Sequence, residues 1–274
     1  MGGARLMGMR NVRMWVSLVG ISCLFLVWLN KFPFELIGDQ YFQASILSYV
    51  GVAFFAYGLM LIVGSPSFEY VRLPRVHFKT LIVIALLSPL VLKFTTNSEI
   101  GPQKLSVAIP GIIFLLTLGV GEELLSRGFV FGVFRRYGQW RAIWASSLLF
   151  GLLHLNLYIG ADWDPWQAYA HVWSTFSFGV LACAVMIATR SIWVSVVLHA
   201  LLDWSIVFTN DPNPGKHYPD WRFDSLWEGF TYPLFDSIGM IVFSWFLLRI
   251  NRGGVPHIPK WAMRLAIKWK LVTA

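Results

Sequence analysis

Residues 121–136, GEELLSRGFVFGVFRR, place three ionisable side chains at the end of an uninterrupted apolar run. The run begins at Leu105 and has the composition of a membrane-spanning helix. Glu122, Glu123 and Arg127 follow it within six residues. An ionised side chain at the centre of a bilayer costs about 2.5–3.5 kcal/mol even on the insertion scale that tolerates charge best. The stretch therefore predicts that the rest of the chain supplies partners, or a function, for these charges.

The composition favours an integral membrane protein with several spans. The chain is 57% hydrophobic and only 13% charged, whereas soluble domains carry about 25% charged residues. Several segments have about 18 or more residues with few or no charges, which is too long for the helices of a soluble protein of this size. The net charge of +8 would suggest nucleic acid in a soluble chain. No aromatic and basic binding module accompanies it, so we expect no nucleic-acid partner.

We predict an all-α fold, a polytopic membrane helix bundle that forms a single integral membrane domain over residues 1–274. About eight transmembrane helices are expected from the apolar runs. A signal peptide is the competing interpretation of the first span. We expect a retained membrane anchor, because no small-residue cleavage site follows it. The predicted spans are 14–30, 42–63, 80–92, 105–134, 143–159, 166–189, 192–209 and 232–250.

The basic residues indicate how the spans are oriented. With the N-terminus in the cytoplasm, the cytoplasmic segments hold Arg5, Arg10, Arg13, Arg72, Arg75, Lys79, Arg135, Arg136, Arg141 and Arg190. The opposite loops hold acidic or mixed stretches, so the positive-inside rule places both termini in the cytoplasm. The basic tail, about 256–274, is typical of an amphipathic helix on anionic membrane lipids. A bacterial inner or plasma membrane is the expected location.

Smaller features fit the same interpretation. Tryptophans near the predicted span ends are typical of an aromatic belt at the membrane interfaces. The two cysteines lie inside apolar runs and are expected to be small buried packing residues, not a disulfide or metal framework. The tryptophans are Trp140, Trp144, Trp163 and Trp166, and the cysteines are Cys23 and Cys183.

Polar side chains inside three predicted spans recur at helical spacing. Glu123 and Arg127 are four residues apart and can pair on one face of a helix, while Glu122 points about 100° away. His154 follows Phe150 by four residues, and Asp203 follows His199 by four. Their depths agree to within a turn or two at 1.5 Å per residue, so three helices can bring these groups to one level of the membrane.

Non-catalytic roles are also compatible with these residues. A single intramembrane histidine is often a hydrogen-bonded packing residue, and a proton-coupled transporter also buries Glu, His and Asp. Transporters usually show repeat symmetry and broken helices in matching halves, which this sequence lacks. A scaffold that uses the polar cluster structurally remains the other alternative. For His171 and Asp236, near the outer ends of their spans, we expect interfacial or structural roles.

The three spaced motifs resemble the CAAX protease and bacteriocin-processing enzyme family of intramembrane endopeptidases, which contains the type II CAAX prenyl proteases. The family pattern is EExxxR, then FxxxH, then HxxxN or HxxxD, on nearby membrane helices. This sequence has all three in order, and the resemblance implies a catalytic core at about 105–209. The matching residues are Glu122, Glu123, Arg127, Phe150, His154, His199 and Asp203.

The resemblance implies a hydrolase that cuts a hydrophobic or lipidated protein or peptide substrate. Glu122 would activate water as a general base. His154 and His199 would orient that water or stabilise the oxyanion, with Asp203 assisting. Glu123, Arg127 and Phe150 would support the site structurally. A carboxylate withdrawn from water suits a general base, and imidazoles can donate to an oxyanion in a low-dielectric site.

The residue at position 203 leaves the role of a metal open. The prenyl-protease branch has Asn there, which can donate a hydrogen bond, whereas an ionised Asp cannot. Asp203 could instead orient His199, ligate a metal or remain protonated. By residue type, the four catalytic residues could bind zinc, but HExxH is absent. We therefore favour a metal-free, glutamic-type mechanism without a cofactor.

Overall fold

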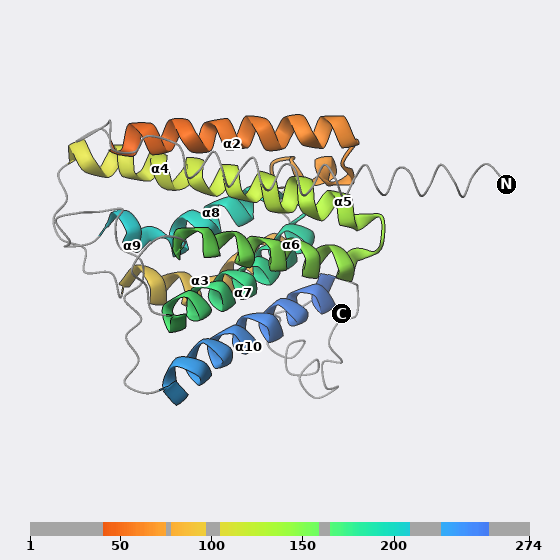
Figure 1. Ribbon diagram of the computed structural model, residues 1–274. Coiled ribbons are helices and arrows are strands. Elements are labelled where there is room, and N and C mark those ends of the chain that lie inside the picture. Colours follow the sequence, from red (N-terminus) through yellow and green to blue (C-terminus); the bar gives the residue numbers. More distant parts are fainter. Residues whose placement is uncertain (1–40, 75–77, 97–104, 159–164, 209–225, 252–274) are drawn as a thin grey trace, which may run out of the picture. The chain divides into compact units, whose positions relative to one another are not determined.

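The computed structural model describes residues 41–74, 78–96, 105–158, 165–208 and 226–251, and every regular element in them is a helix. The all-α prediction is confirmed (Figure 1). The elements are α2 (Tyr41–Val63), η2 (Pro66–Tyr70), α3 (Phe78–Thr96), α4 (Leu105–Glu123), η3 (Leu124–Val130), α5 (Phe131–Arg135), α6 (Gln139–Leu153), η4 (His154–Tyr158), α7 (Pro165–Thr189), α8 (Ile192–Leu202), α9 (Trp204–Val207) and α10 (Leu226–Asn251).

Contacts divide the chain into two compact units, residues 1–44 and 45–274, and the account below concerns the second. The predicted first span and the predicted basic tail lie outside the described residues, as do Cys23 and Trp163. The single domain over 1–274, the total number of spans and the side of the membrane that holds the termini stay predictions.

Four helices are long and apolar enough to cross a membrane. They are Ser45–Val63, Ala108–Arg135, Pro165–Thr189 and Trp227–Arg249. Two other predicted spans contain shorter apolar helices, Thr80–Leu92 and Ile192–Leu202. Each of the seven predicted spans within the described residues therefore contains a helix, although not every helix has the length of a full span.

Helix α7 lies at the centre of the packing. It contacts α3, α6, α8 and α10, and its residues 177–187 are buried on every side. A helix that is apolar and buried all round is typical of a core position. Cys183 is fully buried here, as predicted.

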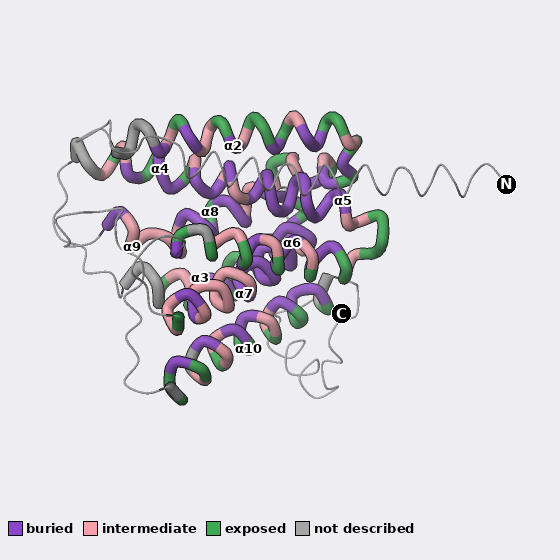
Figure 2. The backbone as a smooth tube through the Cα atoms, in the orientation of Figure 1, coloured by how far each residue is buried: buried purple, intermediate pink, exposed green. Residues whose placement is uncertain are grey.

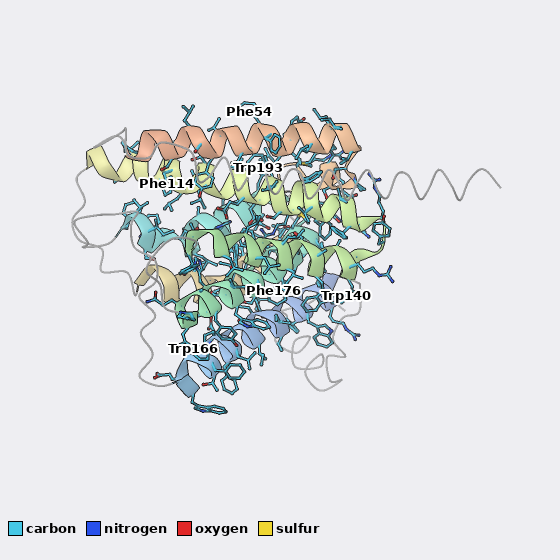
Figure 3. All side chains as sticks on the ribbon, viewed as in Figure 1. Phe54, Phe114, Trp140, Trp166, Phe176 and Trp193 are labelled. Atoms are coloured by element: carbon cyan, nitrogen blue, oxygen red, sulfur yellow. The ribbon has the colours of Figure 1, made fainter. Side chains whose placement is uncertain are left out.

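Figure 2 shows exposed residues along α2 and α10, and several of them are large apolar residues. Ile62 on α2 is 82% exposed and Trp227 on α10 is 74% exposed. A bilayer solvates such side chains. Figure 3 shows Trp140 and Trp166 at opposite ends of the helices, the arrangement expected of aromatic residues at two membrane interfaces.

The connection between α2 and α3 ties together the helices that carry the first and third motifs. The Ser65 hydroxyl donates to the Gly128 carbonyl at 2.9 Å. Farther along the same connection, the carbonyls of Val71 and Arg72 accept hydrogen bonds from the start of α8. The Ser191 hydroxyl donates to the Arg72 carbonyl at 2.8 Å, and the Trp193 indole N–H donates to the Val71 carbonyl at 3.0 Å. These bonds fix the start of α8 against the segment that follows α4.

Glycines let α6 and α7 approach closely. A Cβ added at Gly179 would lie 2.9 Å from the Ser147 Cα, and one added at Gly151 would lie 2.9 Å from the Val172 carbonyl oxygen. Small residues at such crossings are how membrane helices gain packing contacts. Because both obstacles are backbone atoms, a side chain cannot be accommodated by a rotamer change.

We therefore expect Gly179→Ala to destabilise the fold by about 1–3 kcal/mol, the usual cost of overpacking. The measurement is the thermal unfolding midpoint of the purified protein in detergent. Gly239→Ala on α10 is the matched control, because a Cβ there meets nothing within 4 Å. If both variants unfold at the same temperature, the close α6–α7 packing is wrong.

Candidate active site

Each of the three motif segments leaves the regular α-helix at its motif. α4 ends at Glu123 and continues as the π-helical η3. α6 gives way to the 3-10 turn η4 at His154, and α8 ends just before Asp203. The sequence predicted a regular helix through each motif, so the structure corrects that expectation. Irregular turns of this kind concentrate at functional sites and are tolerated at membrane depth where protein buries them.

Serine hydroxyls from neighbouring segments stabilise the π-helical turn. In η3 the Phe131 N–H donates to the Ser126 carbonyl, five residues back. The Ser146 hydroxyl on α6 donates to the same carbonyl at 2.8 Å, and Ser65 donates to the carbonyl of Gly128. All seven residues of η3 are buried, so these bonds satisfy polar backbone where no water reaches.

Glu123 and Arg127 form the ion pair that their spacing predicted. Arg127 Nη1 lies 3.0 Å from Glu123 Oε1, and both side chains are fully buried. The guanidinium also lies over the Phe150 ring, 4.4 Å from its centroid, and 5.6 Å from the Phe178 ring centroid. Cation–π contact in a desolvated site adds to the attraction of the carboxylate, which explains how the membrane interior accommodates this arginine.

The spacing predicts that Glu123 is neutralised within its own helix, but in the structure its side chain also contacts α8. Its Oε1 also lies 3.0 Å from His199 Nδ1 on α8. The reason is the close approach of α4 and α8: a Cβ at Gly119 would lie 2.9 Å from the Val196 carbonyl oxygen. Glu123 thus joins the first motif to the third.

His199 lies among three carboxylates. Its Nε2 is 3.2 Å from Asp203 Oδ2 and 3.7 Å from Glu122 Oε2, while Nδ1 faces Glu123. The imidazole ring packs edge-on against Phe178, with centroids 4.9 Å apart. Both ring nitrogens are therefore directed at acceptor groups.

His154 has one fixed and one available nitrogen. Nδ1 is 2.8 Å from the Phe150 carbonyl oxygen. A carbonyl only accepts, so Nδ1 carries the proton and Nε2 of the neutral ring is an acceptor. The rings of His154 and His199 both pack against Phe150, with centroids 4.8 and 5.8 Å from that of the phenylalanine. The structure thus brings Glu122, His199 and Asp203 together and places His154 on the same phenylalanine ring.

The carboxylates differ in exposure. The side chain of Glu122 is 18% exposed and that of Asp203 is 29% exposed, whereas Glu123 has no exposed surface. Glu122 Oε2 is buried without a hydrogen-bond partner among the described residues. Glu122 Oε2 is thus a hydrogen-bond acceptor that no described group uses.

Residues 104–205 match the family model described as type II CAAX prenyl endopeptidase Rce1-like. This Rce1-like segment contains all three motifs and ends two residues after Asp203. The family resemblance predicted from the motifs is confirmed over these residues. No curated protein and no solved structure matches the chain significantly.

The matched segment also contains contacts that the spacing of the motifs does not predict. His171, for which we expect an interfacial or structural role, has its ring centroid 5.0 Å from that of His154. Nothing in the linear spacing links residue 171 on α7 to η4. The serine donors to η3 carried no recognisable signal either, because a single serine in an apolar run is common.

The placement of these side chains bears on whether zinc could bind at this site. Within the described ranges, no group of three or more His, Cys, Asp or Glu side chains is placed to hold a metal ion. Both nitrogens of His199 lie at hydrogen-bond distance from carboxylates, whereas a zinc–nitrogen bond of about 2.0–2.1 Å requires a nitrogen lone pair directed at the metal. No step below runs through zinc.

Proposed function

We propose that this chain is an endopeptidase that cuts a membrane-associated or lipidated protein or peptide, using a water molecule activated by Glu122. The observation that supports it best is Glu122 Oε2, which has no hydrogen-bond partner among the described residues and lies 3.7 Å from His199 Nε2. The family match over the same residues indicates the reaction class.

The proposed reaction moves one proton twice. Glu122 accepts a proton from water as the water oxygen attacks the peptide carbonyl carbon, giving a tetrahedral oxyanion. The carboxyl group of Glu122 then passes that proton to the amide nitrogen as the C–N bond breaks. The products are an amine and a carboxylic acid, which then loses its proton to solvent. A positioned base of this kind typically contributes about 10²–10⁴-fold to the rate.

The histidines hold the reacting groups. The neutral ring of His154 offers Nε2 as an acceptor for a proton of the attacking water. The protonated ring of His199 can donate from Nε2 to the oxyanion, with Nδ1 held by Glu123. The buried ion pair with Arg127 fixes Glu123 in turn. Preorganised donors in a water-poor site stabilise developing negative charge without reorganisation.

In this scheme Asp203 accepts a hydrogen bond from His199 and so orients its ring. Its Oδ2 faces Nε2 at 3.2 Å, and the amide oxygen of an asparagine could accept there as well. We expect Asp203→Asn to keep kcat within about 10-fold of wild type, and Asp203→Ala to lose about 10–100-fold. Rates are compared at equal folded protein. If Asp203→Asn is as inactive as Asp203→Ala, the charge of Asp203 has a role that this mechanism lacks.

The metal-free mechanism predicts that chelators leave the reaction unchanged. Purified enzyme dialysed against EDTA and 1,10-phenanthroline should keep its cleavage rate within about 2-fold, since no step needs a metal. A zinc protease treated in parallel serves as the control. A loss of activity that added zinc restores would contradict the metal-free mechanism and leave the protease assignment standing.

The function itself is tested in proteoliposomes. The probes are a peptide with a farnesylated CAAX tail, the same peptide without the lipid, and a hydrophobic single-span peptide. Mass spectrometry of the products identifies the cut bond. We expect cleavage of at least one probe by wild type. Binding or transport without any cut product would favour the transporter or scaffold alternative.

A further inference from the structure

Tyr158 and His171 form a polar pair beside the three motifs. The Tyr158 hydroxyl lies 2.8 Å from His171 Nδ1. Tyr158 is 6% exposed and ends η4, while His171 is half-buried on α7. Neither residue has a step in the mechanism proposed above. A buried pair of this kind is retained at the expense of desolvating two polar groups, so its position needs an explanation.

The pair closes a ring of contacts around His154. η4 begins at His154 and ends at Tyr158, and the Tyr158 hydroxyl contacts His171 on α7. The His171 ring then packs edge-on against His154, with an interplanar angle of 67°. On its other side, the His154 ring packs against Phe150 at 4.8 Å between centroids. The imidazole of His154 is thus held between two rings.

His154 needs such support because its backbone is irregular. It is the C-cap of α6 and the first residue of a 3-10 turn, where hydrogen-bond geometry is poorer than in an α-helix. The bond from Nδ1 to the Phe150 carbonyl fixes one point of the ring. Ring contact from His171 restricts the rotation that this single bond leaves open.

We propose that Tyr158 and His171 are positioning residues that fix the ring plane of His154, so that Nε2 faces the water beside Glu122. This inference rests on the proposed function where it assigns His154 to the water. The pair acts through His154 and does not exchange protons with the substrate.

The first test compares kcat and KM in proteoliposomes on whichever probe wild type cuts. Tyr158→Phe removes only the hydroxyl, and we expect kcat to fall about 10-fold with KM within 2-fold, since an interaction needed in the transition state is weakened. Tyr57→Phe is the matched control on α2, where the ring packs on Phe68 away from the site. It should behave as wild type.

A double variant separates positioning from proton transfer. His171→Phe keeps a ring against His154 but removes the hydrogen bond between the Tyr158 hydroxyl and His171 Nδ1. Replacing both partners with apolar groups of similar shape removes that penalty. We expect the combined Tyr158→Phe and His171→Phe variant to recover kcat above either single variant, with an unchanged pH profile. A double variant as slow as His171→Phe alone, with a shifted pH profile, would overturn positioning in favour of proton transfer by His171.

A second measurement, chemical modification of His154, does not depend on cleavage of a substrate. Carbethoxylation of His154 by diethyl pyrocarbonate, mapped by mass spectrometry, reports access to its free nitrogen. We expect Tyr158→Phe to raise the His154 rate several-fold and leave the buried His199 unchanged as an internal reference. Equal His154 rates in wild type and Tyr158→Phe would overturn the inference. If wild type cuts no probe while the His154 rate rises, the proposed function fails and the positioning of His154 stands.

Discussion

Glu122→Gln is expected to lower kcat by about 10²–10⁴-fold while leaving the fold intact. The amide keeps the size and hydrogen-bonding shape of the carboxylate but cannot take a proton from water. Glu122 is partly exposed, and its ion pair with His199 Nε2 is long, at 3.7 Å. The unfolding midpoint should therefore change little.

Glu123→Gln is the matched comparison one residue away. Glu123 Oε1 lies 3.0 Å from both Arg127 Nη1 and His199 Nδ1, so its charge holds two groups in place. We expect Glu123→Gln to lower the unfolding midpoint as well as the rate. If Glu122→Gln keeps full activity, or if both variants lose stability equally, the division of the two glutamates into base and support is wrong.

Arg127→Met is expected to destabilise the fold by about 3–5 kcal/mol, the usual cost of breaking a buried ion pair. The guanidinium is fully buried between Glu123 and the Phe150 ring. Its loss leaves a buried carboxylate with His199 as its remaining partner. The expected readout is a lower thermal midpoint and a smaller monodisperse fraction after extraction in detergent.

Two further variants make this result specific. Arg141→Met removes an exposed arginine from α6 and should leave the midpoint unchanged. Combining Glu123→Gln with Arg127→Met removes both charges and should be more stable than Arg127→Met alone, because no uncompensated ion stays buried. An additive loss in the double variant would contradict a direct pairing of Glu123 with Arg127.

The sequence predicted the helices and the local pairs, because both follow from spacing along the chain. Apolar runs place helices, and a separation of four residues places Glu123 beside Arg127 and His199 beside Asp203. The family resemblance, carried by the same spacing, is also confirmed.

Contacts between helices could not be predicted from the sequence. The bond from Glu123 to His199 depends on how closely α4 approaches α8 at Gly119. The contact of His171 with His154 depends on the crossing of α6 and α7. Such distances are set by packing of side chains from separate segments, and a single sequence contains no spacing rule for them.

The irregular turns were missed for a related reason. The π-helical η3 is supported by hydroxyls of Ser65 and Ser146, which lie on other segments. Helix propensity along residues 105–135 contains no sign of these donors. Likewise, α8 has 11 residues and so is about 16 Å long, short of the roughly 30 Å hydrocarbon core. Because the apolar run continues past Asp203, the sequence gives no sign that α8 ends there.

The most direct test of the central claim needs no assumption about the substrate. Membranes from cells that lack this protein are incubated with purified wild type or with Glu122→Gln at equal folded concentration, and new protein termini are identified by mass spectrometry. The mechanism predicts new termini in membrane-associated proteins with wild type and none with Glu122→Gln. Identical sets of termini with the two proteins would contradict it.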